Sequence, residues 1–530
     1  MAKRTTNLKR GRPRFGHSVI ARSAVQEFMT RPLDNWDWLK GVPPLTLHRE
    51  LKEWKFTSLT PPRGHQMVCT VAGLSNPAFF YMLDMGLGKT WIALNLIRHR
   101  VRHRHTTKPW LVVVPGDVQV ETWNQEAFLH ASDLTVVPLW GTAADRELGL
   151  TQRADVYVMN LAGLQVLLTD LIPDPRKKDK RIRAANDDKV RRFATLFDGL
   201  VLDEAHNFGN HRSLTYALTR PLSRATRYRY LLSGTPFGRD PMMLWPQFNL
   251  MDHGQSLGPT LGLFRAGFFS ARENFWGGME YHFKQRLSPD LTRMMRNASL
   301  RYEDIECIDL PPVVRVVERV ALPADISVLY HEAQEKLRAA QGNRMELEHQ
   351  FIRTRQLASG FVSIADGNGE RVQLEFPSPK LDLLLEHVKE LPTTEKFIVF
   401  HEFTPSGDRI SKALRSQKIE HVRLYGETKD KPAALRTFLH DPACRGLVAN
   451  TRTGGSGGNL QVARYLFFYE SPVSPIVRQQ AEKRCTGARQ TRKSFMYDLV
   501  VTGTNDERIL EFIKEGKDLM QEVCNSKTPG

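Results

Sequence analysis

Cysteine is scarce in this chain of 530 residues, and the five that occur are scattered, with none in a Cys-x-x-Cys pair. Such spacing provides neither a zinc site nor a disulfide framework, which predicts a reducing compartment. Long apolar runs are also missing, since no stretch reaches the roughly 20 residues that a membrane-spanning helix needs. The N-terminus lacks the pattern of a signal peptide, so we expect a cytoplasmic protein.

Acidic residues are outnumbered, with 58 Asp and Glu against 75 Lys and Arg, and the net charge is +17 at pH 7. This excess favours a polyanionic partner such as nucleic acid, although a solvated basic surface would have the same composition. Arg10 and Arg12 lie in an Arg-Gly-Arg-Pro segment that resembles the core of an AT-hook, which inserts arginines into a narrow minor groove. A disordered arm that attracts phosphates unspecifically is the alternative.

The most informative motif lies between an apolar run at 78–83, typical of a buried strand, and a helical pattern at 91–97. It consists of Asp84, Met85, Gly86, Leu87, Gly88, Lys89 and Thr90. In a strand–loop–helix context, glycines let backbone N–H groups surround phosphate oxygens at the start of a helix. Lys89 would reach the β- and γ-phosphates of ATP, and the Thr90 hydroxyl would bind Mg²⁺. The strict pattern has glycine at the position of Leu83, so a chance glycine turn is the alternative.

Two further segments suit nucleotide chemistry. Gln66 precedes the loop by one short helix. Its side-chain amide could bind both the donor and the acceptor edge of adenine. An apolar run from 199 ends in Asp203 and Glu204, which places two carboxylates where ligands bind in open α/β sheets. Asp203 could hold Mg²⁺ through water, and Glu204 could position and deprotonate the attacking water. The basic stretch at 170–193 is interpreted as a surface insertion, either a DNA contact or a solvated loop.

Strand and helix patterns alternate through both halves of the chain, which predicts parallel sheets covered on both faces. The second α/β unit begins near residue 378. Its glycine-rich run at 453–460 follows an apolar strand pattern, so it is interpreted as a tight loop that approaches phosphate rather than as a flexible linker.

These motifs occur in the order of the superfamily-two helicase motors. They are Gln66, residues 84–90, Asp203-Glu204-Ala205-His206 and residues 233–236. The loop sequence Asp-Met-Gly-Leu-Gly-Lys-Thr is similar to the phosphate loop of the Swi/Snf-type DNA-translocating ATPases. A strand ending in Val-Pro before Trp123, and a Leu-Pro-Pro at 310–312, also resemble that family, and the resemblance covers roughly residues 50–515.

The resemblance implies an α/β fold with two RecA-like parallel-sheet lobes, helical protrusions and a C-terminal helical brace. The expected domains are a basic N-terminal arm and lead-in (1–49), lobe 1 with the ATP site (50–250), helical protrusions and the inter-lobe linker (251–379), lobe 2 (380–510), and a brace helix with a tail (511–530). The compact length and the absence of chromatin-reading domains suggest a bacterial or phage source.

The resemblance also implies roles in lobe 2. The segment from Arg452 matches the fifth motif, so Arg452 and Gly455 are expected to contact DNA and Gly457 the nucleotide. In the sixth motif Arg484 corresponds to an arginine finger. The second arginine position holds Gly487, and Arg489 is the nearest replacement. A second departure is Val473, where the family commonly has a DNA-contacting tryptophan.

The expected function is that of an ATP- and Mg²⁺-dependent translocase that hydrolyses ATP between the lobes and moves along double-stranded DNA without separating the strands. We expect it to act as a monomer. A strand-separating DNA or RNA helicase is the first alternative, although no strand-splitting hairpin is recognisable in the sequence. A nucleic-acid-binding scaffold with a decayed ATPase is the second, suggested by Leu83, Gly487 and Val473.

Overall fold

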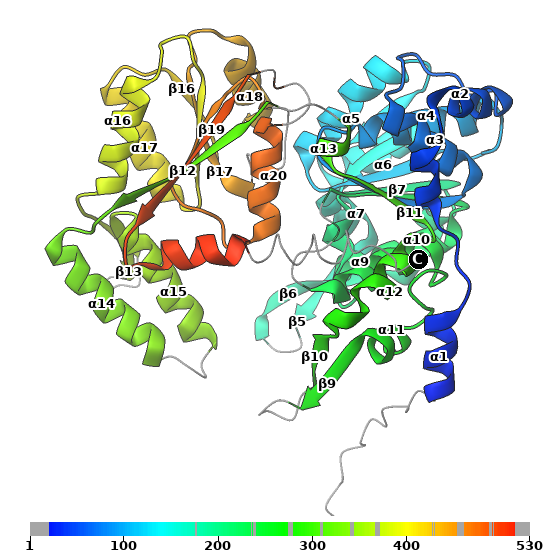
Figure 1. Cartoon of the computed structure of the whole chain (residues 1–530), viewed down its shortest axis with the longest axis horizontal. Coiled ribbons are helices and arrows are strands. Elements are labelled where there is room, and N and C mark those ends of the chain that lie inside the picture. The colour runs from blue at the N-terminus through cyan, green and yellow to red at the C-terminus, as the bar shows by residue number, and fades with distance from the viewer. Residues whose placement is uncertain are drawn as a thin grey trace, which may run out of the picture.

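The computed structural model folds into two α/β lobes that lie side by side (Figure 1). It describes residues 21–174, 177–234, 236, 240–273, 279–307, 311–339, 344–365, 371–426, 428, 430–452, 460–486, 490 and 492–514. Lobe 1 holds the N-terminal half of the chain, and lobe 2 the C-terminal half. The expected α/β class with two parallel-sheet lobes is confirmed.

Lobe 1 is built on a seven-stranded sheet in the order β11-β1-β8-β7-β2-β4-β3, in which every pair is parallel. Its strands are β1 (Ala78–Leu83), β2 (Trp110–Val114), β3 (Val136–Leu139), β4 (Val156–Asn160), β7 (Gly199–Asp203), β8 (Tyr228–Leu232) and β11 (Ser299–Tyr302). The central strands are almost continuous apolar runs because helices cover both faces of the sheet.

The helical elements of lobe 1 follow the strands in the alternation that the sequence predicts. They are α1 (Arg22–Thr30), η1 (Trp36–Gly41), α2 (Pro44–Glu53), α3 (Gly64–Ser75), α4 (Lys89–Arg102), α5 (Asp117–His130), α6 (Ala143–Thr151), α7 (Leu161–Leu168), α8 (Asp187–Ala194), η2 (Ala205–Phe208), α9 (Leu214–Ala225), η3 (Pro241–Met243), α10 (Leu244–Asp252), α11 (Leu261–Phe268), η4 (Gln285–Leu287), α12 (Ser288–Met295) and α13 (Asp304–Cys307).

Lobe 2 has a six-stranded parallel sheet in the order β12-β19-β18-β15-β17-β16. Its strands are β12 (Val313–Val320), β15 (Phe397–His401), β16 (His421–Leu424), β17 (Gly446–Asn450), β18 (Tyr465–Phe468) and β19 (Ser494–Val501). Its helices are α14 (Ala324–Ala339), α15 (Arg344–Ala358), α16 (Pro379–Glu390), α17 (Thr404–Ser416), α18 (Lys431–His440) and α20 (Pro475–Thr486). Residues 505–514 form a further helix at the end of the described chain.

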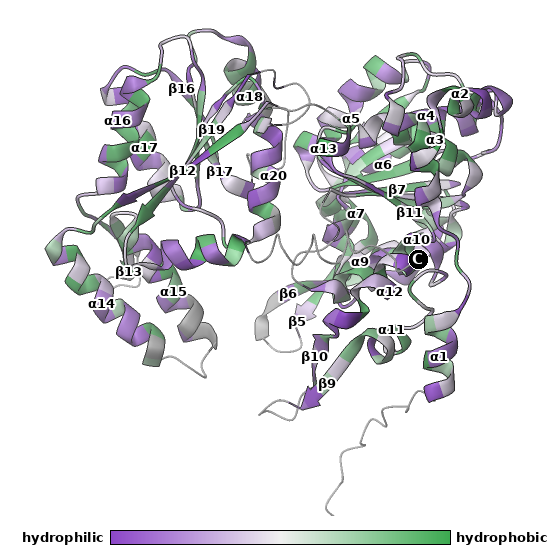
Figure 2. Cartoon of the chain, viewed as in Figure 1, coloured by the Kyte–Doolittle hydropathy of each residue, from purple (hydrophilic) through white to green (hydrophobic). Residues whose placement is uncertain are grey.

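Each sheet separates two hydrophobic cores. Along β2, Leu111 and Val113 face one core while Val112 and Val114 face the other, because side chains alternate between the faces of a strand. The strands of lobe 2 divide its core in the same way. In Figure 2 the hydrophobic residues accordingly gather inside each lobe, and the outer helix surfaces carry the hydrophilic ones.

The segment expected to form helical protrusions and a linker, 251–379, contributes one strand to each sheet. Within it, β11 pairs with β1 in lobe 1, and β12 pairs with β19 in lobe 2. It also contains two hairpins, β9 (Phe269–Glu273) with β10 (Met279–Phe283), and β13 (Phe361–Ala365) with β14 (Arg371–Glu375). The expected borders at 250 and 380 therefore do not coincide with the limits of the two sheets. The four-residue strand β11 is too short to leave a periodic signal in the sequence.

The basic insertion is also more ordered than a loop. It begins with the antiparallel hairpin of β5 (Thr169–Asp174) and β6 (Lys177–Ala185), which projects from the lower part of lobe 1, and α8 follows. Within the described residues, none of the helices combines the length and the apolar character that crossing a membrane requires.

Candidate active site

The candidate site lies at the carboxyl ends of three neighbouring strands of lobe 1. The phosphate loop follows β1, the segment Ser233-Gly234 follows β8, and Asp203 ends β7. These strands are adjacent and parallel, so the three segments meet at one edge of the sheet. Ligands of open α/β sheets bind at this edge.

The phosphate loop requires glycine at two positions. Gly86 and Gly88 have φ angles of 82° and 76°, in the left-handed region that side chains rarely adopt. A Cβ added to Gly88 would also lie 2.2 Å from Gln66 Nε2. Gly88 immediately precedes α4, so the loop ends on the positive end of a helix, with Lys89 and Thr90 in its first turn. This cradle fits the phosphates of a nucleotide.

The departure from the strict motif at Leu83 has a structural explanation. Leu83 is the last residue of β1, and its side chain is fully buried in the core. Its carbonyl accepts a hydrogen bond of 2.8 Å from Lys89 Nζ, and the carbonyl of Asp84 accepts a longer one of 3.3 Å. The lysine that would bind phosphates is thus held at the loop by backbone oxygens, and a leucine at position 83 disturbs nothing in this arrangement.

Gln66 contacts the phosphate loop directly. Its Oε1 accepts a hydrogen bond from the backbone N–H of Arg63, and its Nε2 donates to the carbonyl of Leu87. His65 Nε2 lies 2.9 Å from the same carbonyl. Both side chains are buried. The two residues therefore support the loop from α3, and the reading of adenine by Gln66 stays a prediction.

The two carboxylates at the end of β7 are in different environments. Asp203 Oδ2 accepts a hydrogen bond of 2.8 Å from Trp123 Nε1, and Oδ1 accepts one from the backbone of Glu204. Burial, together with the charge of Glu204, raises the pKa of Asp203 to about 6. Burial also pushes the pKa of Glu204 upwards. However, its contact with His206 and the charges of Lys89 and Arg484 outweigh this and lower it. Glu204 thus keeps the ionised form that a general base needs.

Glu204 is held in a strained backbone conformation, with a φ of 50°. Left-handed geometry at a non-glycine residue costs free energy and concentrates at functional sites. His206 follows in η2, and its Nδ1 lies 3.4 Å from both Glu204 Oε2 and Ser233 Oγ. On the other edge of the ring, Nε2 lies 3.4 Å from Gln480 Nε2 of lobe 2. His206 therefore connects the carboxylates, the segment after β8 and the opposite lobe.

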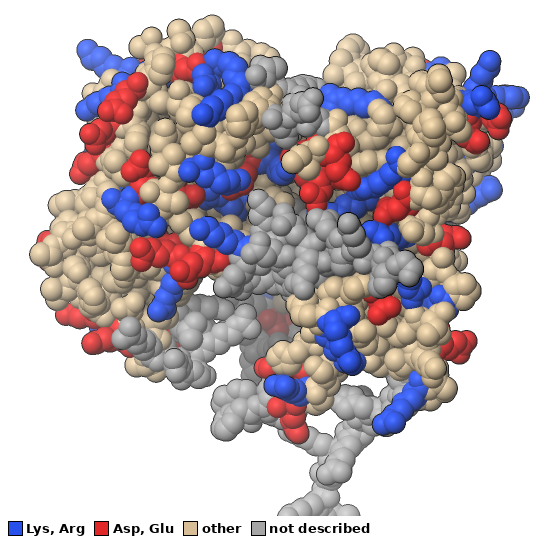
Figure 3. All heavy atoms as spheres, in the orientation of Figure 1, with Lys and Arg blue, Asp and Glu red and all other residues tan. Residues whose placement is uncertain are grey.

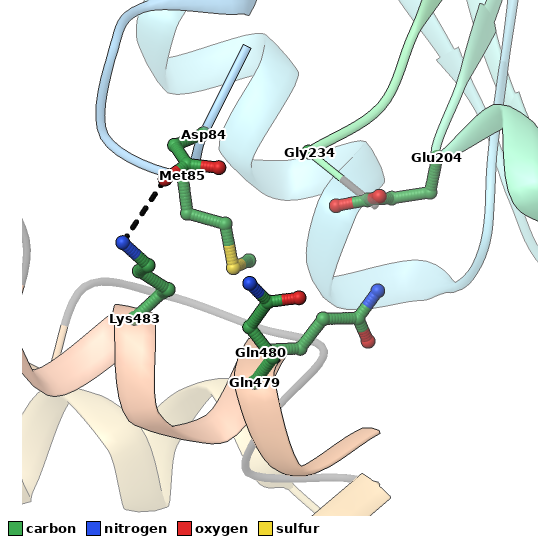
Figure 4. A pocket seen from close by; sticks show the side chains of 7 residues that line it. All are labelled: Asp84, Met85, Glu204, Gly234, Gln479, Gln480 and Lys483. Carbon is green, nitrogen blue, oxygen red and sulfur yellow. Dashed lines mark hydrogen bonds and ion pairs between the residues drawn. The ribbon is translucent and has the colours of Figure 1, made fainter. Parts of the chain in front are cut away.

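Lobe 2 faces this site with α20. A narrow cleft between the lobes is lined by Asp84, Met85, Glu204, Gly234, Gln479, Gln480 and Lys483 (Figure 4). Arg484 lies on the same helix. It is close enough to Glu204 and Asp203 for their negative charges to stabilise its positive charge. Burial nevertheless lowers the pKa of Arg484. The arginine expected to act as a finger is therefore brought to the carboxylate pair of the other lobe.

The predicted residues are only partly brought together. Glu204 lines the cleft, and Lys89, Asp203 and Arg484 lie close enough to it or to each other for their charges to interact. Thr90 follows Lys89 in the first turn of α4. Arg452 is exposed two residues after the end of β17, and its charge lowers the pKa of Glu402, although burial raises that pKa more. The remaining expected residues, Arg10, Arg12, Gly455, Gly457 and Arg489, lie outside the described residues.

Sequence reasoning assigned no role to three residues that the structure places at the site. Trp123 bonds to Asp203, while Lys483 and Asp304 form an ion pair beside the phosphate loop. For Trp123 the only signal was its position in a resembling motif. Lys483 stands next to the predicted finger, but a lysine on a helix is ordinarily a solvated residue, and Asp304 lies in a segment without a motif.

The comparisons with known proteins agree with this geometry. The SNF2-related domain family matches residues 80–363, and the helicase conserved C-terminal domain family matches residues 379–488. Protein CHROMATIN REMODELING 19 of Arabidopsis thaliana is 23% identical over 511 residues, which cover 81% of this chain and 64% of that protein. Putative protein p41 of Acyrthosiphon pisum secondary endosymbiont phage 1 is 24% identical over 442 residues, which cover 81% of this chain and 90% of that protein.

The chain thus spans less than two thirds of the Arabidopsis protein and most of the phage protein. Among solved structures, the Sulfolobus solfataricus SWI2/SNF2 ATPase core in complex with dsDNA matches with a TM-score of 0.37 and 19% identity, covering 88% of this chain and 94% of that one. The first family alone matches more than half of the chain. The chain therefore belongs to the SNF2-related family, with a helicase C-terminal domain in its second lobe.

Proposed function

We propose that this protein is an ATP-dependent translocase that moves along double-stranded DNA without obligatory strand separation. The observation that carries the proposal is the approach of Arg484 and Gln480, on one helix of lobe 2, to Glu204 and His206 of lobe 1. A hydrolysis site that takes residues from both lobes is sensitive to their relative position. Nucleotide turnover can therefore be coupled to lobe movement.

Each residue has a defined task in this proposal. Bound Mg²⁺–ATP supplies the γ-phosphoryl group and the metal charge that neutralises it. Lys89 and the N–H groups of the loop bind the phosphates, and Thr90 with Asp203 would hold the metal ion. Glu204 orients a water molecule and accepts its proton. Arg484 stabilises the charge that develops in the transition state, and it does so only when the lobes are in contact.

The DNA partner is supported by the family and by the positive net charge of the whole chain. On the face shown in Figure 3, basic side chains are spread over both lobes and alternate with acidic ones. We assign DNA contacts to Arg452 and Gly455 and to the tail residues Arg10 and Arg12. We also place the protein, as a monomer, in the cytoplasm of a bacterial or phage-infected cell.

The test compares ATP hydrolysis in the presence of duplex DNA, single-stranded DNA and RNA at matched nucleotide concentration. Duplex DNA should stimulate hydrolysis most, and the stimulation should fall steeply with salt because counterions are released on binding. A third strand bound in the major groove should be displaced in an ATP-dependent manner while the underlying duplex stays paired. Equal stimulation by RNA, or no displacement of the third strand, would contradict the proposal.

The β5–β6 hairpin favours a second candidate, strand separation. The sequence contains no recognisable wedge motif, but this hairpin projects from lobe 1 and exposes Leu171, Ile172 and Ile182. Apolar side chains on a projecting ribbon can stack against bases that have lost their partners. Replacing residues 171–183 by a short glycine turn distinguishes the two candidates. If the intact protein separates a forked duplex and the shortened protein does not, the second candidate is correct.

A further inference from the structure

Lys483 joins the two lobes at the start of the phosphate loop. Its Nζ lies 3.0 Å from Asp84 Oδ2 (Figure 4), and it also contacts Asp304 Oδ2. Lys483 belongs to α20 of lobe 2, whereas Asp84 follows β1 and Asp304 begins α13 in lobe 1. One ammonium group therefore bridges two carboxylates across the lobe interface.

This triad is largely withdrawn from water. The side chains of Asp84, Asp304 and Lys483 are 9%, 14% and 21% exposed. Burial by itself lowers the pKa of Lys483, but the two carboxylates outweigh it and raise the pKa, so the ammonium keeps its charge. Charges in such surroundings are weakly screened, unlike those of surface ion pairs, which contribute little.

Asp84 links the triad to the lysine of the phosphate loop. Its backbone N–H donates to the carbonyl of Tyr302, and its own carbonyl accepts a hydrogen bond from Lys89 Nζ. Its Oδ2 accepts a further hydrogen bond from the backbone of Asp304. The main chain of Asp84 thus holds Lys89 while its side chain holds Lys483. Asp84 therefore connects Lys483 of lobe 2 directly to Lys89 of the phosphate loop.

We propose that Lys483 is a positioning residue for ATP. It neutralises Asp84 and Asp304 beside the phosphate loop, and it docks lobe 2 against that loop. The inference rests on the proposed ATP site at Lys89. Without Lys483, two carboxylates would face the place where the triphosphate binds, and their repulsion would weaken ATP binding.

The test measures the dissociation constant of a fluorescent ATP analogue with Mg²⁺ and without DNA. Lys483→Ala should weaken binding by about tenfold, because a largely buried charge is removed while its partners remain. Lys483→Arg should bind nearly as well as the unsubstituted protein. The double variant Lys483→Ala/Asp304→Asn should recover much of the loss, because one of the two unpaired charges is gone. Lys412→Ala, an exposed lysine of α17 in the same lobe, is the matched control.

Steady-state kinetics separate this role from others. A positioning role raises KM for ATP and leaves kcat at saturating ATP within a few fold. Unchanged binding in Lys483→Ala, or equal losses in the single and double variants, would refute the inference. A fall in kcat alone would assign Lys483 to the transition state and refute it as well. If the unsubstituted protein bound no ATP analogue, the proposed function would fail first, so the two failures are distinguishable.

Discussion

Trp123 Nε1 donates a hydrogen bond of 2.8 Å to Asp203 Oδ2, so an indole from α5 fixes the carboxylate that ends β7. This bond links α5 to the end of β7 and holds the proposed metal ligand in one orientation. It also favours the ionised carboxylate, since the hydrogen bond from Trp123 lowers the pKa of Asp203 and opposes the larger effect of burial. Orientation and charge of Asp203 thus depend on one aromatic residue.

Trp123→Phe removes this donor while keeping much of the aromatic volume. Because the ionised form loses its hydrogen bond, the pKa of Asp203 should rise above the present value of about 6. The acidic limb of the rate–pH profile should therefore move to higher pH, and more Mg²⁺ should be needed for half-maximal rate. Hydrolysis measured against pH and Mg²⁺ concentration checks both effects. An unshifted acidic limb would mean that Trp123 only packs.

Glu204→Gln should separate nucleotide binding from chemistry. The amide keeps the size of the side chain but cannot accept a proton, so kcat should fall by about 10²- to 10⁴-fold while ATP still binds. Lys89→Ala is the contrasting variant, because loss of the phosphate-binding charge should weaken ATP binding as well as turnover. Binding of a labelled ATP analogue and single-turnover hydrolysis distinguish the two. Near-normal turnover in Glu204→Gln would remove that residue from its proposed role.

Gly88→Ala should abolish ATP binding. Alanine is strained at a φ of 76°, and its Cβ would lie 2.2 Å from Gln66 Nε2. The loop would have to shift at the position where it ends on α4. Gly64→Ala is the matched control, since an added Cβ there meets nothing within 4 Å. Calorimetric titration with ATP measures both variants, and a loop that binds normally with alanine at 88 would contradict the proposed cradle.

Arg484→Ala should nearly abolish DNA-stimulated hydrolysis and leave most ATP and DNA binding intact, because an arginine finger acts in the transition state. Loss of such a finger commonly costs on the order of a thousandfold in rate. Arg489→Ala tests whether Arg489 supplies the second arginine finger, because the expected position of that finger holds Gly487. An equal loss of turnover would make Arg489 the second finger. Normal turnover with weaker DNA binding would leave this motor with a single one.

Stability should fall in mild acid because of His99 on α4. This side chain is buried beside His103, His105 and Arg100, and burial, followed by these charges, lowers its pKa to about 3. The unfolded chain binds the proton below about pH 6.5 and the folded protein does not. The contribution of His99 to the free energy of unfolding is therefore complete above about pH 6.5 and declines as the pH falls below it. Near pH 5 the loss is up to about 2 kcal/mol.

His99→Leu tests this expectation in urea titrations at pH 7.5 and pH 5. The variant should lose less stability between the two pH values than the unsubstituted protein. His48→Leu, an exposed histidine of α2, is the comparison at a solvated position. Equal pH dependence in all three proteins would exclude His99 as the source of acid sensitivity.

The sequence by itself determined the α/β class and located the candidate site of lobe 1. Residues 84–90 and the Asp203-Glu204 pair are contiguous, and the roles proposed for them follow from local geometry at strand ends. The apolar runs predicted the buried parallel strands for the same reason, since each is a signal within a few residues. Leu83 was ambiguous only because a motif records residue types and not which side chain points into the core.

Only the tertiary structure decided the contacts between distant residues. Lys483 and Asp84 are 399 positions apart, and no local pattern indicates that their charges meet. The short strand β11 pairs with β1 in the sheet of lobe 1, whereas β12 pairs with β19 in the sheet of lobe 2. Both strands lie in the segment that was expected to link the lobes. The physical reason is common to these cases. Strand pairing and ion pairing depend on which surfaces the folded lobes bring together, and that information is distributed over the whole chain.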